Sequence, residues 1–180
     1  PEGDFGVKVN GANGGPAPES LTDAIYACSQ QLEGYQIHEP ISLNLETAGQ
    51  QSIGTLQLEV IDGVDDYVAL MQKLFDFDQI RELLRSDFPI AFDAMHAVTG
   101  PYAKRLLEGL LGASAGSVRN AVPLEDFGGG HPDPNLTYAH DLAELLMDSD
   151  AYRFGAACDG DGDRNMILGT RCFVNPSDSL

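Results

Sequence analysis

Three aspartates separated by single glycines form the most distinctive stretch of the sequence, CDGDGDRNMIL. Asp159, Asp161 and Asp163 follow one another at every second position, and carboxylates this close together repel one another unless a cation lies between them. Gly160 and Gly162 allow the tight turn that would make the three side chains converge. Hard oxygen ligands that leave coordination positions open suit Mg²⁺, so this turn is predicted to hold Mg²⁺ beside water or a phosphoryl oxygen.

Other interpretations of this turn are weaker. An EF-hand calcium loop starting at Asp159 would need glycine at its sixth position and glutamate at its twelfth, where the sequence has Arg164 and Thr170. Haloacid-dehalogenase-type phosphatases have a small hydroxyl residue after Asp-x-Asp, whereas glycine and a further aspartate follow here. A solvated acidic turn is the remaining alternative. Arg164 favours a phosphoryl site, because a cation beside a metal pairs with an anionic group, but neutralising the aspartates would explain it equally well.

Alternating strands and helices are predicted to position the turn. Period-two or short apolar patterns predict strands at residues 4–10, 56–62, 89–95, 117–122 and 152–158. Helical spacing predicts helices at residues 19–32, 62–75, 76–86, 100–112 and 135–149, with Asp76 or Asp78 as a cap. Such alternation favours a largely parallel sheet with right-handed crossovers.

Polar segments follow three of these predicted strands, at residues 93–100, 123–134 and 159–164. In open α/β sheets, ligands bind beyond the carboxyl ends of the strands. We therefore expect at least the last two segments to lie along one edge of the sheet.

The composition excludes some classes of partner. The 180 residues include 28 acidic and 10 basic side chains, for a formal charge of −18, which disfavours binding to nucleic acid or to an anionic membrane. The odd set of three cysteines suits a reducing compartment, and the sequence offers neither a membrane-length apolar run nor a secretion signal. A soluble, cytoplasmic protein is predicted. Because the chain opens on Pro1, we expect a fragment or a processed product.

Five segments together resemble phosphoglucomutases of the α-D-phosphohexomutase superfamily: GVKVNGANGGPAPE, DAMHAVTGPY, PLEDFGGGHPDPNLTYA, GAACDGDGDRNMILG and FVNPSDS. They occur in the order of that family and span almost the whole chain. The resemblance implies an α/β fold with a mixed, largely parallel sheet and helices on both faces. It also implies a division into three parts. Residues 1–62 would form the C-terminal part of domain I, residues 63–174 would form domain II with the metal loop, and residues 175–180 would begin domain III.

The resemblance further implies an isomerase of glucose metabolism. Such an enzyme interconverts glucose 1-phosphate and glucose 6-phosphate through a phosphoserine and glucose 1,6-bisphosphate, with Mg²⁺ held by residues that match Asp159, Asp161 and Asp163. Arg164 would lie at the same site. Lys8 would lie near the phosphoserine, where it could transfer a proton or stabilise charge. The expected partners are a phosphorylated hexose and the remaining domains of the enzyme, without nucleic acid or membrane.

The sequence departs from the family in one important respect. The catalytic serine of the family lies in a Ser-His-Asn-Pro stretch, which this chain does not contain. We also find neither the sugar-discriminating loop of the third domain nor the phosphate-binding loop of the fourth. The chain alone is therefore predicted to be inactive, and the alternative is a non-catalytic phosphoglucomutase-like binding or scaffold protein.

Four other side chains have simpler interpretations. Lys8 alternates with valines, so it could be a solvated lysine on the outer face of a strand. His96 and His131 lack a second ligand at metal-binding spacing and are predicted to make structural hydrogen bonds. Cys158 ends an apolar strand, where a buried thiol beside aspartates should have a raised pKa.

Overall fold

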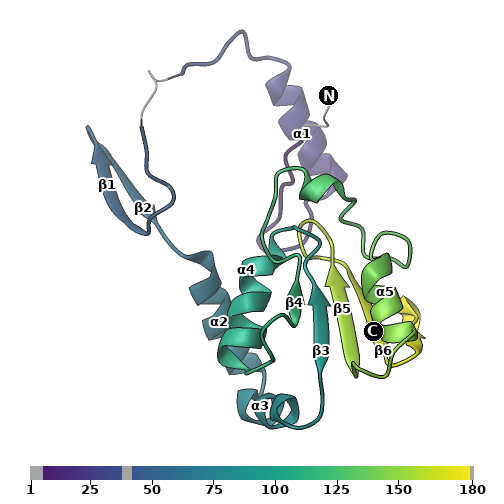
Figure 1. Ribbon diagram of the computed structural model, residues 1–180. Helices are drawn as coiled ribbons and strands as arrows, with labels where there is room; N and C mark the ends of the chain where they lie inside the picture. The colour runs from purple at the N-terminus through teal and green to yellow at the C-terminus, as the bar shows by residue number, and fades with distance from the viewer. Residues whose placement is uncertain (1–5, 38–41, 179–180) are drawn as a thin grey trace. The chain divides into compact units, whose positions relative to one another are not determined.

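The computed structural model describes residues 6–37 and 42–178 and divides the chain into two compact units (Figure 1). Unit 1 is Pro1–Glu46 and unit 2 is Thr47–Leu180. This division follows packing within each unit. The division into three parts at residues 62 and 174 stays a prediction, and residues 179 and 180 of its last part lie outside the described residues.

The described residues of unit 1 contain one regular element, helix α1 (Glu19–Ser29). The predicted helix is confirmed, although it ends three residues early, because the amides of Gln31 and Leu32 bond to carbonyls only three positions back. The predicted strand at residues 4–10 is wrong where it can be judged: residues 4 and 5 lie outside the described residues, and Gly6–Val9 form no strand. Within the described chain, the pairing recorded for this segment is an isolated antiparallel bridge between Asn10 and Pro16, and a single bridge leaves most backbone groups of a strand unsatisfied.

A two-stranded hairpin opens unit 2. Strands β1 (Gly49–Ile53) and β2 (Leu56–Val60) pair antiparallel around a turn in which Gly54 has φ +58°. The alternating LQLEV pattern predicted β2, and the structure confirms it. Strand β1 was not predicted, because its GQQSI sequence has no apolar alternation.

The main sheet has five strands in the order β4-β3-β5-β6-β7. Their bounds are β3 (Ile90–Asp93), β4 (Val118–Arg119), β5 (Phe154–Cys158), β6 (Asn165–Gly169) and β7 (Cys172–Val174). The three strands β4, β3 and β5 are parallel, whereas β6 and β7 are antiparallel to their neighbours. The predicted α/β class with a mixed sheet is thus confirmed, and parallel pairing is confined to the three strands that alternate with helices.

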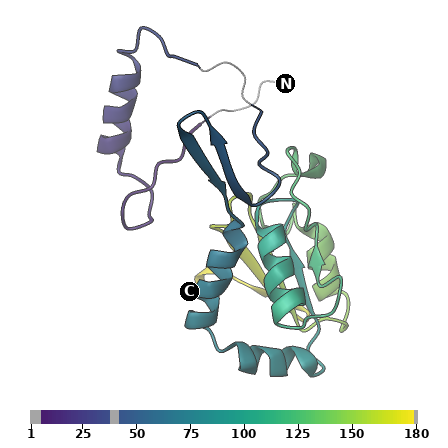
Figure 2. The same cartoon turned by 90° about the vertical axis from the view of Figure 1, so that its left-hand side faces the viewer.

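Helices cover both faces of this sheet, as predicted (Figures 1 and 2). Helix α5 (His140–Met147) places Leu142 and Leu146 against the side chains of Ala157, Met166 and Leu168 in the core. Alternate strand residues such as Phe92, Ala156 and Ile167 face the other side, where they line a pocket with helices α2 (Gly63–Leu74) and α4 (Thr99–Ala103). This alternation is the period-two geometry of strands buried on both faces.

Local hydrogen bonds set the helix boundaries. The side chain of Asp62 caps α2. Of the two caps that the sequence offered for helix α3 (Phe77–Arg85), the structure shows Asp76 and not Asp78. Helix α4 continues as a π-helix, η1 (Lys104–Leu110), which confirms the helix predicted at residues 100–112. The described residues also include two short 3₁₀ turns, η2 (Phe127–Gly129) and η3 (Pro176–Asp178).

Two further predicted boundaries differ from the structure by three residues or more. Helix α5 begins five residues later than predicted, because the Asn135 side chain accepts bonds from the amides of Thr137 and Tyr138 and holds them in a turn. Strand β4 has only two residues, because the next residue, Asn120, has φ +47° and bends away to bond with Asp93. None of the helices in the described part of the chain has the length and apolar character that crossing a membrane requires.

Candidate metal centre

The three aspartates lie on the connection between β5 and β6. Strand pairing closes the connection at Cys158 and Asn165, and the amide of Asp159 donates to the carbonyl of Arg164 at 3.2 Å. Gly162 has φ +80°, a conformation that favours glycine. The glycine-hinged turn that the sequence predicts is therefore present.

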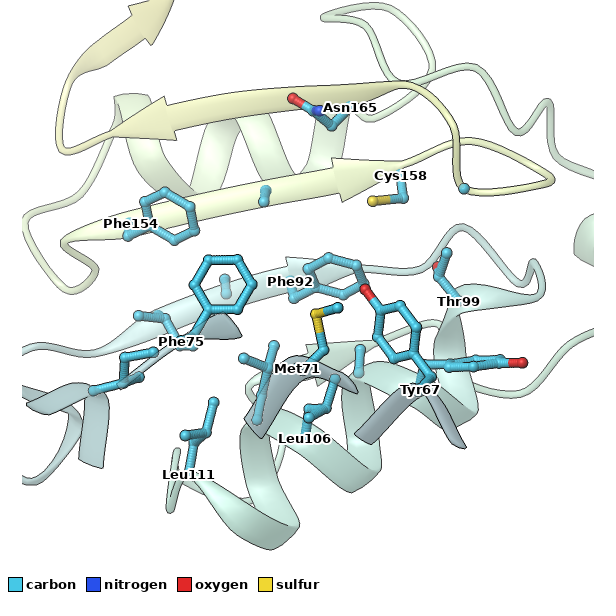
Figure 3. Close-up of a pocket in the computed structure, with 18 of the residues that line it drawn as sticks. Tyr67, Met71, Phe75, Phe92, Thr99, Leu106, Leu111, Phe154, Cys158 and Asn165 are labelled. Carbon is cyan, nitrogen blue, oxygen red and sulfur yellow. The ribbon is translucent and has the colours of Figure 1, made fainter. Parts of the chain in front are cut away.

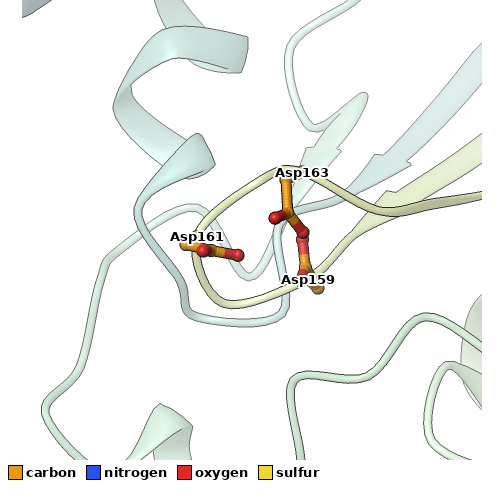
Figure 4. Close-up of side chains that lie close together, drawn as sticks. All are labelled: Asp159, Asp161 and Asp163. Atoms are coloured by element: carbon orange, nitrogen blue, oxygen red, sulfur yellow. The ribbon is translucent and has the colours of Figure 1, made fainter. Parts of the chain in front are cut away.

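The turn brings the three carboxylates together (Figure 4). One oxygen from each of Asp159, Asp161 and Asp163 lies within 4.8 Å of the others. Asp159 is buried, with 2% of its surface exposed, whereas Asp161 and Asp163 are exposed. One buried and two exposed carboxylates can bind a cation from one side and leave its outer side open.

The donor set fits the metal that the family resemblance implies. All three groups are hard carboxylate oxygens, which Mg²⁺ prefers, and three protein ligands leave positions for water or a substrate oxygen.

Arg164 contacts the turn from within. Its backbone amide donates to Asp159 Oδ1 at 3.0 Å, and its Nε donates to Asp159 Oδ2 at 2.9 Å. Its Nη1 donates to Asp133 Oδ1 at 2.8 Å, in the loop that follows β4. The hydrogen bond that the Arg164 side chain donates to Asp159, together with the charge of that carboxylate, raises the pKa of Arg164 further above its already high value. The guanidinium therefore stays charged and offsets part of the acidic cluster.

The loops after the parallel strands meet at this edge of the sheet, as predicted. The segment after β3 reaches the turn through Thr99, the first residue of α4, whose methyl group would lie 2.8 Å from a Cβ placed on Gly162. The loop after β4 reaches it through Asp133 and through Phe127, whose ring lies beside Gly160. Parallel strands place their carboxyl ends at one edge, which explains why segments far apart in sequence converge here.

Sequence reasoning did not single out Asp133, although it flagged the surrounding loop. Asp133 lies 31 positions before its partner Arg164, and no short-range spacing reports such a contact. A loop rich in polar residues at the end of a parallel strand was the available signal. Lys8, the other predicted catalytic residue, is exposed in unit 1, whereas the turn belongs to unit 2, so its role stays a prediction.

The side chains with simple interpretations largely behave as expected. Burial, and then the charge of Asp159, raise the pKa of the Cys158 thiol to about 11, so the thiol is protonated at neutral pH. His96 Nδ1 lies 3.0 Å from the carbonyl oxygen of Val122, a structural hydrogen bond. The ring of His131 stacks on Tyr138 with centroids 4.3 Å apart, which is a packing contact.

A pocket of about 640 Å³ lies beside the turn, on the α2 and α4 face of the sheet. It is predominantly apolar, and Asp161 and Gly162 contribute to its lining. Residues drawn around it in Figure 3 include Phe154, Cys158 and Asn165 from the strands and Tyr67, Met71 and Leu106 from the helices. Its lining contains no Lys or Arg side chain, so it does not provide the positive charge that a sugar phosphate requires.

Comparison with known proteins identifies the family. The profile of the phosphoglucomutase/phosphomannomutase α/β/α domain II matches residues 65–171. The chain therefore belongs to the phosphoglucomutase/phosphomannomutase family, and the resemblance noted from its sequence motifs is confirmed.

Individual relatives agree with this assignment. A phosphoglucomutase of Rhizobium radiobacter is 54% identical over 180 residues, covering 100% of this chain and 33% of the relative. A chloroplastic phosphoglucomutase of Arabidopsis thaliana is 53% identical over 181 residues, covering 100% of this chain and 29% of the relative. A crystal structure of pp63/parafusin from Paramecium, in its open form, is also similar. That protein is described as an exocytosis-sensitive phosphoprotein and phosphoglucomutase. The match has a TM-score of 0.89 and 49% sequence identity, and it covers 98% of this chain and 34% of that one. The chain thus spans about a third of the length of its relatives.

Proposed function

We propose that this chain is the metal-binding portion of a Mg²⁺-dependent phosphoglucomutase that interconverts glucose 1-phosphate and glucose 6-phosphate. The observation that carries the proposal is the convergence of three carboxylates within 4.8 Å at the carboxyl edge of a sheet whose family acts on phosphorylated sugars. Asp159, Asp161 and Asp163 would hold the ion. Bound Mg²⁺ would supply positive charge to a phosphoryl group during its transfer.

The protein side chains contribute position and charge. Asp159 is fixed by two bonds from Arg164 and buried, so it gives the site a rigid base. Arg164 is 62% exposed, and we propose that its guanidinium also attracts the phosphoryl group from solvent. Lys8 is proposed to stabilise charge or transfer a proton near the phosphoserine. The phosphoserine route through glucose 1,6-bisphosphate requires a serine segment that this chain does not contain.

The proposal is tested by turnover of glucose 1-phosphate to glucose 6-phosphate in a longer natural polypeptide that carries this chain and a Ser-His-Asn-Pro segment. Asp161→Asn should reduce Mg²⁺-dependent turnover by about 100-fold or more, because loss of outer-shell partners alone costs roughly 10–100-fold. Lys8→Met should reduce turnover without changing the melting temperature.

Two controls complete this experiment. Asp141→Asn makes the same change of charge at an exposed position of α5, outside the three-carboxylate cluster, and should leave turnover unchanged. The 180-residue chain alone should show no turnover, because it offers no phosphoserine. Full Mg²⁺-dependent activity of Asp161→Asn would refute the proposed function.

A further inference from the structure

The pocket of about 640 Å³ on the α2 and α4 face of the sheet has no part in the proposed function. Its volume lies within the roughly 300–1,000 Å³ that is typical of sites for small molecules. Tyr67, Phe75 and Val98 line the pocket and are exposed, so apolar surface at its rim is in contact with water. An apolar ligand that covered this surface would be bound favourably.

The strand register defines the two ends of the pocket. Phe154 and Cys158, the first and last residues of β5, both line it, and the four residues of strand that separate them span about 13 Å. Figure 3 shows these two side chains at opposite ends of the pocket. Ile90 pairs with Phe154 at one end, whereas Asn165 pairs with Cys158 at the other. Asp161 also lines the pocket and belongs to the turn that follows Cys158, so the pocket has an apolar end and an end beside the aspartate turn.

A buried hydroxyl lies at the end beside the aspartate turn. Thr99 lines the pocket, and Figure 3 shows it on the same side as Cys158. Thr99 Oγ1 is one of two buried side-chain nitrogen or oxygen atoms that have no hydrogen-bond partner among the described residues. Most buried polar groups have a partner, and a hydroxyl oxygen accepts a hydrogen bond from an O–H or N–H group. This atom therefore indicates where a ligand would place a donor.

The charge of the lining determines which ligands fit. Among the described residues, no Lys or Arg side chain lines the pocket, and Asp161 contributes a carboxylate. An anionic ligand would lose its hydration and would gain no positive partner. A cationic ligand would have Asp161 as its acidic partner in the lining, and that carboxylate belongs to the proposed metal cluster. An uncharged ligand fits best.

We infer that this pocket is a binding site for an uncharged small molecule that has an elongated apolar body and a hydroxyl or amide N–H group at one end. The apolar body lies along β5 from Phe154, and the donor bonds to Thr99 Oγ1. The inference goes beyond the proposed function and does not depend on it, because its test requires neither bound metal nor turnover.

The test titrates 4-butylphenol into the full-length natural polypeptide that carries this chain and follows side-chain methyl signals by NMR. The signals of Met71, Leu106 and Ile167, which line the pocket, should shift most. Those of Leu142 and Leu146, in the core on the α5 face of the sheet, should shift little. Absence of binding, or binding that leaves the pocket signals unchanged, would overturn the inference.

The head group is tested with related compounds and one variant. 4-Butylbenzoate is anionic at neutral pH and should bind about 10-fold more weakly than 4-butylphenol, because a buried carboxylate would have no cation to pair with. Thr99→Val keeps the shape of the side chain and removes its hydroxyl. It should weaken binding of 4-butylphenol about 5-fold, the size of one neutral hydrogen bond, and leave binding of butylbenzene unchanged. Equal weakening of both compounds would overturn the hydrogen bond assigned to Thr99.

The position of the ligand is tested by filling the pocket. Ala156 is buried in the middle of β5 and lines the pocket. Ala156→Leu should weaken binding of 4-butylphenol about 10-fold or more, because the larger side chain would overlap the ligand. Ala151→Leu makes the same change at an exposed position outside the lining and should change the affinity by less than about twofold. Wild-type affinity in Ala156→Leu would overturn the inference, and Thr99→Val decides it if that variant does not fold.

Two other occupants of the pocket would give different results. If a second copy of the protein covered it, the wild type would sediment as a dimer that Ala156→Leu dissociates, and 4-butylphenol would not bind the dimer. If another segment of the longer polypeptide covered it, 4-butylphenol would not bind and Ala156→Leu would lower the melting temperature. Either result would overturn the inference.

Discussion

Gly162 is the residue on which the geometry of the aspartate turn depends most directly. Its φ of +80° disfavours any side chain, and a Cβ at this position would lie 2.8 Å from Thr99 Cγ2, closer than real Cβ contacts allow. Gly112 has the same φ of +80° but nothing within 4 Å of its added Cβ. Alanine substitutions at the two glycines therefore allow the cost of backbone strain to be measured apart from the cost of steric overlap.

We expect Gly112→Ala to lower the free energy of unfolding by about 1 kcal/mol, the cost of placing alanine in left-handed backbone. Gly162→Ala should cost about 1–2 kcal/mol more, because overpacking adds to that strain. Urea unfolding of both variants measures the difference. Thr99→Ser removes the methyl group in question, so adding it to Gly162→Ala should recover most of the extra loss. Equal costs at the two glycines would contradict the proposed overlap.

The aspartate turn was predictable at the scale of residues, but its supporting contacts were not. Carboxylates at alternate positions with glycines between them carry their own local signal, and the structure brings them together. The contact between Asp133 and Arg164 depends on which strands pair, and pairing is a property of the whole sheet. Local spacing does not encode it.

At the scale of elements, the alternating patterns predicted strands only where a neighbouring strand pairs with them. The strands β3 and β5 were predicted and form, because each lies beside another strand. The alternating segment at residues 4–10 has the same kind of pattern, yet its described part forms no strand. Periodicity reports which face an element would bury, whereas pairing requires a neighbour.

Glu108 joins two elements of unit 2 and has a predictable effect on stability. Its Oε1 accepts from the amides of Gly116 and Val118 at 3.0 and 2.9 Å, and its Oε2 accepts from Lys104 at 2.7 Å. Burial opposes ionisation, but the bonds from Lys104 and the two amides outweigh it and lower the pKa of Glu108. The carboxylate thus holds the turn before β4 against the π-helix.

Glu108→Gln should lower the free energy of unfolding at pH 7 by about 2 kcal/mol, the size expected for hydrogen bonds to a charged group. A carboxyl whose folded pKa is lowered stabilises the fold above its unfolded pKa, and this contribution is lost as the pH falls through the folded pKa. The difference in the free energy of unfolding between wild type and Glu108→Gln should therefore shrink as the pH falls below the unfolded-state pKa of Glu108. Urea titrations from pH 7 down to pH 3 measure it.

Glu144→Gln is the matched control for this prediction. Glu144 pairs with His140 along α5, and both side chains are about 60% exposed, at 59% and 62%. Exposed pairs of this kind contribute little to stability. A gap at Glu108 that stayed constant with pH would show that its charge is not the cause.

At the scale of the whole molecule, charge determines what the described unit can bind. Four carboxylates and one guanidinium lie at the metal centre: those of Asp133, Asp159, Asp161 and Asp163, and that of Arg164. A divalent cation offsets only two of the three excess negative charges. A phosphoryl dianion would then still meet net negative charge, on a chain with a formal charge of −18. Tight binding of a sugar phosphate consequently requires basic groups that this cluster does not supply.

The two compact units also differ in how many of their side chains are buried. Every described side chain of unit 1 is exposed or half-buried, and α1 contains no buried residue. A helix of 11 residues without a packed face is marginal in water, where isolated helices shorter than about 12–15 residues rarely persist. Unit 2, by contrast, has a core in which Leu142, Leu146 and Leu168 are fully buried.

We therefore expect residues 1–46 to add little to the stability of unit 2. Removing them should change its free energy of unfolding in urea by less than about 0.5 kcal/mol, the range of surface changes. In the intact chain, amides of α1 should exchange with solvent at nearly unprotected rates, while amides of β3 and β5 should exchange only on global unfolding. Hydrogen exchange resolved by residue tests this directly. Strong protection of α1, or a large loss of stability on truncation, would mean that unit 1 folds as a stable body in this chain.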